Sequence, residues 1–190
     1  MFDAAEEVFG KLGYERAGIS EITRTAGVGL GTFYVYFPNK LAIFVELVDE
    51  LGSRLRTTLR DAVQGETSRL DVERAGLRAF LDFAAQHRHL YRIVRQAEFV
   101  DEAVFLRYYQ RLGKAYASGL ARAVEAGELR PLDPEVMAYA LMGMADFLGM
   151  RFVLQNTAAR REHVVDEVMT MLTEGLAPKG RATRSARASR

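Results

Sequence analysis

The segment from Thr25 to Lys40 gathers side chains whose chemistry suits contact with a phosphate backbone. The hydroxyl groups of Thr32, Tyr34 and Tyr36 can donate hydrogen bonds to phosphate oxygens, and Lys40 adds a positive charge. Glycines at positions 27, 29 and 31 lack side chains that would keep the backbone away from a ligand. This pattern favours a DNA-contacting turn followed by a very short helix.

A helix this short is unstable in isolation, because nucleation costs more than a few hydrogen bonds return. Neighbouring segments must hold it, and apolar residues recur there at helical spacing. The first predicted helix contains Phe2, Ala5, Val8, Phe9 and Leu12, and Gly13 closes it. The second contains Ile19, Ile22 and Ala26, and the third contains Leu30, Phe33 and Phe37. With the start of a fourth helix at Pro38-Asn39, they predict a helix-turn-helix domain over residues 1–47.

Residues 1–48 resemble the DNA-binding domain of TetR-family transcriptional repressors. The resemblance rests on Ala4-Ala5 with Phe9, Gly13-Tyr14, Ile19 with Ile22, Ala26-Gly27-Val28, Gly31-Thr32-Phe33-Tyr34, Tyr36-Phe37 and Asn39-Lys40. It implies that Thr32, Tyr34, Tyr36 and Lys40 touch the DNA backbone, and that the start of the third helix reads bases. Beyond about Leu51 the chain resembles the family only in length and helical layout.

The recognition segment departs from the family pattern in its polar residues. Gly29 and Leu30 stand where relatives often carry a serine and a basic residue, and Ala17-Gly18 replaces a threonine and a serine. We therefore expect specificity to depend on backbone contacts, a few side chains and DNA shape. The predicted DNA-contacting residues are Thr23, Arg24, Gly29, Leu30, Gly31, Thr32, Tyr34, Tyr36 and Lys40. The alternative is that Tyr34 and Tyr36 only pack in a core.

The composition excludes several classes of protein but does not identify a ligand. The 190 residues are 49% hydrophobic and 27% charged, with no cysteine, which excludes disulfides and cysteine-bound zinc and is typical of a reducing cytoplasm. The acidic, amphipathic start is unlike a signal peptide. The first 45 residues hold four basic and five acidic side chains, so charge does not indicate DNA binding and the motif must carry that inference.

The remainder is predicted to be all-α, giving about nine helices in total and a regulatory and dimerisation domain over residues 48–177. A connector at 64–67 precedes a capping-box sequence beginning at Ser68, which starts a helix to about Gln86. A basic, aromatic segment over 87–95 leads to a helix over about 101–126, and Asp133-Pro134 should begin the next. Residues 178–190 read as a basic, disordered tail.

The predicted helix over 136–154 is apolar on every side, with Asp146 and Arg151 as its charged residues. Such a helix is either buried all round or spans a membrane, and its charges and small residues argue against a span. We expect it to be buried by its own domain on one side and by a second subunit on the other. A final helix over 161–176 would complete a four-helix bundle across a two-fold axis.

The second half is richer in aromatic and methionine residues than an ordinary core requires, and Asp146 lies alone among them. This predicts a cavity for an apolar or aromatic molecule, although plain core packing is the alternative. Arginines at 88, 92 and 95 could bind an anionic head group, as on an acyl or aryl coenzyme A thioester, or form a salt-bridged face. The predicted ligand-binding residues are Tyr91, Arg92, Arg95, Phe99, Phe105, Tyr108, Tyr109, Tyr116, Met142, Asp146, Phe147 and Met150.

These patterns predict a homodimeric repressor whose partners are a palindromic double-stranded operator and a small-molecule effector, with no membrane contact. His87 and His89 lie on different helix faces and His163 is remote, so we expect no metal site and no cofactor. Without a nucleophile beside a base, we expect no enzyme. The alternatives are a helical enzyme or carrier that uses the same cavity, and a DNA binder without an effector.

Overall fold

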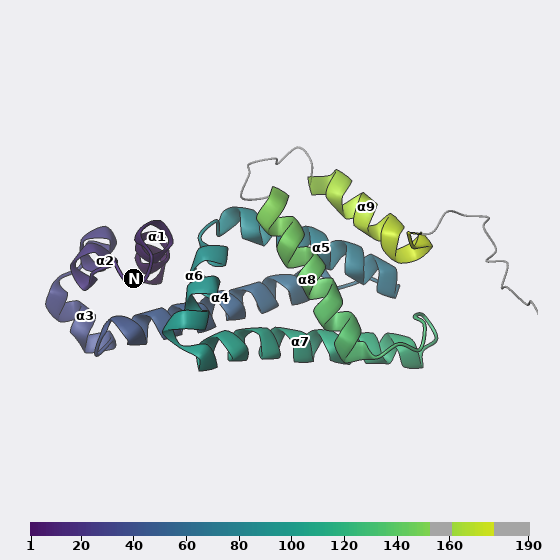
Figure 1. Cartoon of the computed structure of the whole chain (residues 1–190), viewed down its shortest axis with the longest axis horizontal. Helices are drawn as coiled ribbons and strands as arrows, with labels where there is room; N and C mark the ends of the chain where they lie inside the picture. The colour runs from purple at the N-terminus through teal and green to yellow at the C-terminus, as the bar shows by residue number, and fades with distance from the viewer. Residues whose placement is uncertain (153–160, 177–190) are drawn as a thin grey trace, which may run out of the picture.

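The computed structural model describes residues 1–152 and 161–176, and in this part of the chain it contains helices and no strand (Figure 1). The helices are α1 (Phe2–Leu12), α2 (Ile19–Ala26), α3 (Leu30–Tyr36), α4 (Lys40–Ala62), α5 (Arg69–Gln86), α6 (Leu90–Val100), α7 (Glu102–Glu125), α8 (Pro134–Phe152) and α9 (Arg161–Glu174). The predicted all-α class is confirmed. The predicted tail at 178–190 and the end of the helix predicted over 136–154 lie outside the described residues.

Side-chain caps fix where four of the helices begin. Oxygen atoms of Asn39, Ser68, Asp101 and Asp133 accept hydrogen bonds from backbone N–H groups two or three residues later, at 2.8–3.1 Å. Each cap satisfies a donor that has no partner within its own helix. At the other end of α2, Gly27 adopts the left-handed conformation, with φ of 68°, which a glycine reaches without steric cost. The sequence predictions for these boundaries are confirmed.

Helix α6 was not predicted from the sequence, because the histidines before it and its own Arg92 and Arg95 indicate a basic segment. Its buried side chains are nevertheless spaced as on one helix face: Leu90, Tyr91, Ile93, Val94 and Ala97. Figure 1 shows α6 running across the molecule between α1 and the longer helices. It packs against α1, α4 and α7. Helix α6 is therefore placed where the two halves of the chain meet.

The helices form an elongated molecule with α1–α3 at one end and α4 running from them into the other half (Figure 1). One buried hydrophobic cluster joins the two halves, since it contains Phe9 of α1 and Phe33 of α3 as well as Ile93 of α6 and Tyr108 of α7. A second cluster holds α9 against α5 and α6. The core thus continues past residue 47, the predicted domain boundary.

Helix α8 buries only part of its surface. Ala138 and Gly149 are buried, whereas Val136, Tyr139 and Phe147 are exposed on another face of the same helix. The exposed residues are spaced three to eight residues apart, so they form an apolar stripe along the helix. Within the described residues, no helix is both long enough and apolar enough to cross a bilayer.

Gly10 should be essential to the contact between α1 and α6. A Cβ atom at this position would overlap Cγ and Cβ of His89, and the Cβ of His89 cannot move away unless its backbone moves. We expect Gly10→Ala to lower the free energy of unfolding by about 1–3 kcal/mol in chemical denaturation. Gly31→Ala is the matched control, because its Cβ would meet no atom within 4 Å and alanine favours a helix. Equal stability of the two variants would contradict the proposed close contact.

Candidate DNA-binding surface and ligand cavity

Two buried rings anchor α3 to the N-terminal core. Phe33 and Phe37 lie four residues apart and are almost inaccessible to solvent, with ring centroids 5.6 Å from each other. The remaining side chains must point outward, and Tyr34, Tyr36 and Val35 are 53%, 67% and 78% exposed. The tyrosines are therefore surface residues, and the alternative that they only fill a core does not fit the structure. Gly29, Leu30, Gly31, Thr32 and Arg24 are exposed as well.

Thr23 was predicted to contact DNA, and the structure corrects this. Its side chain is only 5% exposed, and its hydroxyl donates a hydrogen bond to the carbonyl of Ser20 at 3.2 Å. Thr23 follows Ile22 and shares the inward face of α2 with it, so it helps to build the core beneath the surface. Of the polar residues predicted on α2, Arg24 is the one that faces solvent.

Lys40 has a structural role in this domain. Its ammonium group donates hydrogen bonds to the carbonyls of Tyr14 at 2.8 Å and Glu15 at 3.3 Å, and lies 4.4 Å from the centre of the Tyr14 ring. These contacts tie the start of α4 to the loop after α1. An ammonium group has three donor protons, so one remains for a phosphate oxygen. Its predicted contact with DNA stays a prediction.

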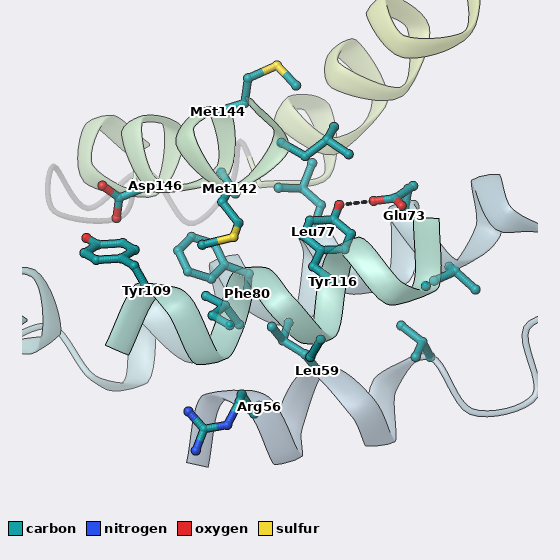
Figure 2. A pocket seen from close by; sticks show the side chains of 18 of the residues that line it. Arg56, Leu59, Glu73, Leu77, Phe80, Tyr109, Tyr116, Met142, Met144 and Asp146 are labelled. Atoms are coloured by element: carbon teal, nitrogen blue, oxygen red, sulfur yellow. Dashed lines mark hydrogen bonds between the residues drawn. The ribbon is translucent and has the colours of Figure 1, made fainter. Parts of the chain in front are cut away.

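A cavity of about 400 Å³ lies among α4, α5, α6, α7, α8 and α9 (Figure 2). This volume is within the range of small-molecule sites, about 300–1,000 Å³, and most of the lining is aliphatic, aromatic or thioether. The predicted ligand-binding residues that line it are Tyr91, Arg95, Tyr108, Tyr109, Tyr116, Met142 and Asp146. Five residues named in the same prediction lie elsewhere.

Helix faces explain those five misplacements. Phe99 and Phe147 are 87% and 64% exposed. Phe105 packs against the larger core cluster, and Met150 packs against the smaller one. Arg92 points to α1, as described below. Aromatic content alone could not show which side of α6, α7 or α8 faces inward.

One end of the cavity contains a buried ion pair that sequence reasoning missed. Arg69 donates to Glu73 from Nε at 2.7 Å and from Nη2 at 2.5 Å, and both side chains are about nine-tenths buried. The hydroxyl of Tyr116 on α7 donates to the same carboxylate, which Figure 2 shows at one side of the cavity. Burial, together with the Glu73 charge, raises the pKa of Tyr116. The spacing of Arg69 and Glu73, four residues apart, was the available signal.

The opposite end holds polar groups that are not fully satisfied. Figure 2 shows Asp146 and Tyr109 facing each other there, away from Glu73. Burial raises the pKa of Asp146 against the opposing effect of Arg95, and burial with the Asp146 charge raises the pKa of Tyr109 to about 12. The hydroxyl of Tyr91 is buried against Gly149 and has no hydrogen-bond partner among the described residues. A buried hydroxyl without a hydrogen-bond partner is unfavourable, so a polar group that bonds to it would stabilise this end of the cavity.

Helix α6 connects the cavity to the DNA-binding half. Leu90, Tyr91, Val94 and Arg95 line the cavity. On the other side, Nη1 of Arg92 donates to the carbonyls of Gly10 at 2.8 Å and Lys11 at 3.1 Å, which have no partners within α1 at its C-terminal end.

Two further contacts strengthen this junction. Oε1 of Gln96 accepts a hydrogen bond of 2.5 Å from the backbone N–H of Tyr14. Nδ1 of His87, just before α6, lies 3.1 Å from both carboxylate oxygens of Glu6. Together with those of Arg92, these contacts join α6 and the residues just before it to α1 and the loop that follows it. Among the residues that the structure describes, His, Asp and Glu side chains form no group of three suited to hold a metal ion.

Comparison with known proteins agrees with this architecture. The family profile described as "Bacterial regulatory proteins, tetR family" matches residues 2–47. The chain is 29% identical to the uncharacterized HTH-type transcriptional regulator YdgC of Bacillus subtilis, over 97% of this chain and 94% of that protein.

Two solved structures have the same fold. The fatty acid degradation regulator FadR of Bacillus halodurans has a TM-score of 0.82 at 23% identity, over 92% of this chain and 93% of that one. FadR of Bacillus subtilis in complex with stearoyl-CoA has a TM-score of 0.80 at 20% identity, over 93% of this chain and 97% of that one. At these identities the likeness establishes the fold.

The raised pKa of Asp146 predicts a pH-dependent effect on stability. Between the unfolded and folded pKa values the folded protein binds more protons, so its stability falls as pH rises through that range. We expect Asp146→Asn to be more stable than the parent at neutral pH, and the gain to fade as pH falls toward about 4, the ordinary value for aspartate. Thermal denaturation from pH 4 to 8 measures this. Asp61→Asn, on the surface beside Arg60, is the control for the same substitution outside the cavity.

Proposed function

We propose that this chain, a member of the TetR family of bacterial regulatory proteins, is a homodimeric transcriptional repressor that leaves its operator when a small apolar molecule fills the cavity. Helix α6 is the observation that carries the proposal. One of its faces lines the cavity and the other holds the C-terminal end of α1 through Arg92 and Gln96. A cytoplasmic site of action follows, because a bacterial regulator that binds DNA must act where the DNA lies.

The α3 surface supports binding in the major groove. Each subunit would insert α3 into one half of a palindromic site, with the two helices about 34–36 Å apart. Thr32, Tyr34 and Tyr36 are exposed and offer hydroxyl groups for phosphate oxygens. Arg24 offers a guanidinium group in the same half of the chain, and Lys40 keeps one donor proton. These residues, with Gly29, Leu30 and Gly31, are the DNA-contacting set that we retain.

The apolar stripe of α8 supports a homodimer. Val136, Tyr139 and Phe147 would be covered by the same stripe of a second subunit, as an isologous interface requires. Ala140 and Gly143 lie between them and would let the two helices approach closely. Leu172 of α9 is also exposed and would extend the contact. A four-helix bundle of two α8 and two α9 helices remains the arrangement that we propose.

The lining of the cavity favours a ligand that has a long apolar part and an anionic group. The anionic group should lie away from Asp146. An anion placed about 5 Å from Asp146 would be repelled by about 3 kcal/mol at an effective dielectric constant of about 20. Arg56, Arg60 and Arg122 also line the cavity, so the negative end of the ligand would be directed to them. Arg92, which was predicted for this role, instead donates a hydrogen bond to the carbonyl of Gly10 in α1. An acyl or aryl coenzyme A thioester fits this division, and the stearoyl-CoA complex of a protein with the same fold supports testing acyl chains first.

Release would follow from a difference in ligand affinity between two conformations, since a ligand shifts an equilibrium only by that difference. A filled cavity would displace Tyr91 and the rest of α6. Arg92 and Gln96 would then carry α1 with them, and the spacing of the two α3 helices would no longer match the operator. Helix α4, continuous from Lys40 to Ala62, would turn with the DNA-binding half.

Filling the cavity with a side chain tests this function. Figure 2 shows Met142 pointing into the cavity beside Phe80. Because an indole ring at this position would occupy the cavity as the effector is proposed to do, we expect Met142→Trp to bind its own upstream DNA about tenfold or more weakly than the parent. Long-chain acyl-coenzyme A should release the parent from this DNA and should leave the residual binding of the variant unchanged, in fluorescence anisotropy. Leu106→Trp, at an exposed site on α7, is the matched control and should respond like the parent.

The outcomes distinguish the alternative functions. In one outcome the parent protein binds DNA, but no acyl or aryl thioester changes that binding or raises the melting temperature of the protein. This result would favour a DNA binder without an effector. Ligand binding without DNA binding would favour a helical enzyme or carrier.

A charge on the α8 stripe tests the dimer. Phe147 is exposed in a single subunit, so Phe147→Asp should leave the subunit folded but place two carboxylates in the proposed interface. We expect sedimentation to show a monomer and operator affinity to fall by more than tenfold, because two half-sites are no longer bound together. Leu106→Asp controls for a new charge at an exposed leucine. A Phe147→Asp dimer of unchanged affinity would contradict this interface.

A further inference from the structure

The outward face of α3 carries no charged or amide side chain. The residues of this helix are Leu30, Gly31, Thr32, Phe33, Tyr34, Val35 and Tyr36, and the phenylalanine among them is buried. Base edges in the major groove are usually read by arginine or lysine at guanine and by asparagine or glutamine at adenine. None of these side chains is present on α3, so this common form of hydrogen-bonded reading is absent from the helix.

Val35 occupies the position that points farthest from the core. At 100° per residue it lies opposite the direction shared by Phe33 and Phe37, the two anchors of the helix. Its side chain is 78% exposed, the highest value among the aliphatic and aromatic residues of α3. Gly31 and Thr32 lie one turn earlier on the same side, and a Cβ on Gly31 would meet no atom within 4 Å. The backbone beside Val35 is thus unobstructed.

Leu30 gives a second aliphatic group at the leading end of the helix. It is 49% exposed although it is the first residue of α3 and could have turned toward the core. Single exposed apolar residues are ordinary on protein surfaces. Leu30 and Val35, however, lie on the same seven-residue helix, and insertion of this helix into the major groove would bury both side chains. Their favourable partner there is the C5-methyl group of thymine, the apolar feature of the major-groove edge.

We propose that Val35 and Leu30 read thymine methyl groups, and that each half of the operator is selected by thymines at the positions facing α3. The proposal rests on the proposed function, since it assumes that α3 enters the major groove. Hydroxyl groups of Thr32, Tyr34 and Tyr36 hold the phosphates and set the register. The two aliphatic side chains then supply sequence preference by apolar contact, without hydrogen bonds to bases.

Deoxyuridine isolates this contact, because it keeps every hydrogen-bonding group of thymine and lacks only the methyl. An operator is first selected from random double-stranded DNA with the full-length protein. Each thymine is then replaced by deoxyuridine, in both halves of the site together. We expect the sensitive position to lose about threefold to fivefold in affinity per methyl, the effect of burying one such group, and therefore about tenfold to twenty-fivefold per palindrome.

Variants assign the effect to the side chains. Val35→Ala or Leu30→Ala should bind the thymine operator more weakly and remove the difference between thymine and deoxyuridine at its own position. Leu41→Ala, an exposed leucine at the start of α4, is the matched control and should keep the full difference. The measurement on the parent protein does not depend on the variants' folding.

Three results would overturn the inference. One is full affinity for every deoxyuridine operator. Another is a methyl effect that survives in both alanine variants. The third is failure to select any DNA, which would overturn the proposed function as well. If an operator is selected but its affinity does not depend on thymine methyl groups, this inference alone is overturned.

Discussion

The guanidinium group of Arg92 on the last carbonyls of α1 is the contact on which the relation between the two halves of this protein depends. Those carbonyls of Gly10 and Lys11 have no hydrogen-bond partner inside α1, and Arg92 brings a charge-assisted donor to both from a different helix. The next residue along the chain toward the N-terminus, Tyr91, lines the cavity. A single turn of α6 therefore meets both regions. The cavity and the end of α1 are thus separated by the width of one helix.

The cavity is defined by its two polar ends as much as by its apolar middle. At one end the carboxylate of Glu73 is satisfied by Arg69 and Tyr116, so burial leaves no donor or acceptor of that group in need of a partner. At the other end, Asp146 is partly buried near tyrosines that do not bond to it, and the Tyr91 hydroxyl has no partner among the described residues. The same low dielectric environment strengthens the satisfied hydrogen bonds at the first end and makes the unpaired hydroxyl at the second end unfavourable.

Much of the fold followed from local chemistry, and much of the site did not. Asn39, Asp101 and Gly27 act within one turn of their own backbone, so their spacing was sufficient to place the helix boundaries. Phe33 and Phe37 likewise predicted which side of α3 is buried. Lys40 and Arg92 bond to carbonyls 25 to 82 residues away, and such contacts depend on how the helices cross. Thr23 could have been assigned correctly, because it shares an inward face with Ile22.

The shared core has a consequence for how this regulator can be rebuilt. Phe9 and Phe33 belong to the same buried cluster as Ile93 and Tyr108, which lie more than fifty residues later in the chain. A chimera joined at residue 47 would separate these side chains and leave apolar faces of α1 and α4 without their cover. The DNA-binding half is thus not a detachable module. Exchange of operator specificity between regulators must either replace α3 side chains alone or transplant α6 together with α1–α4.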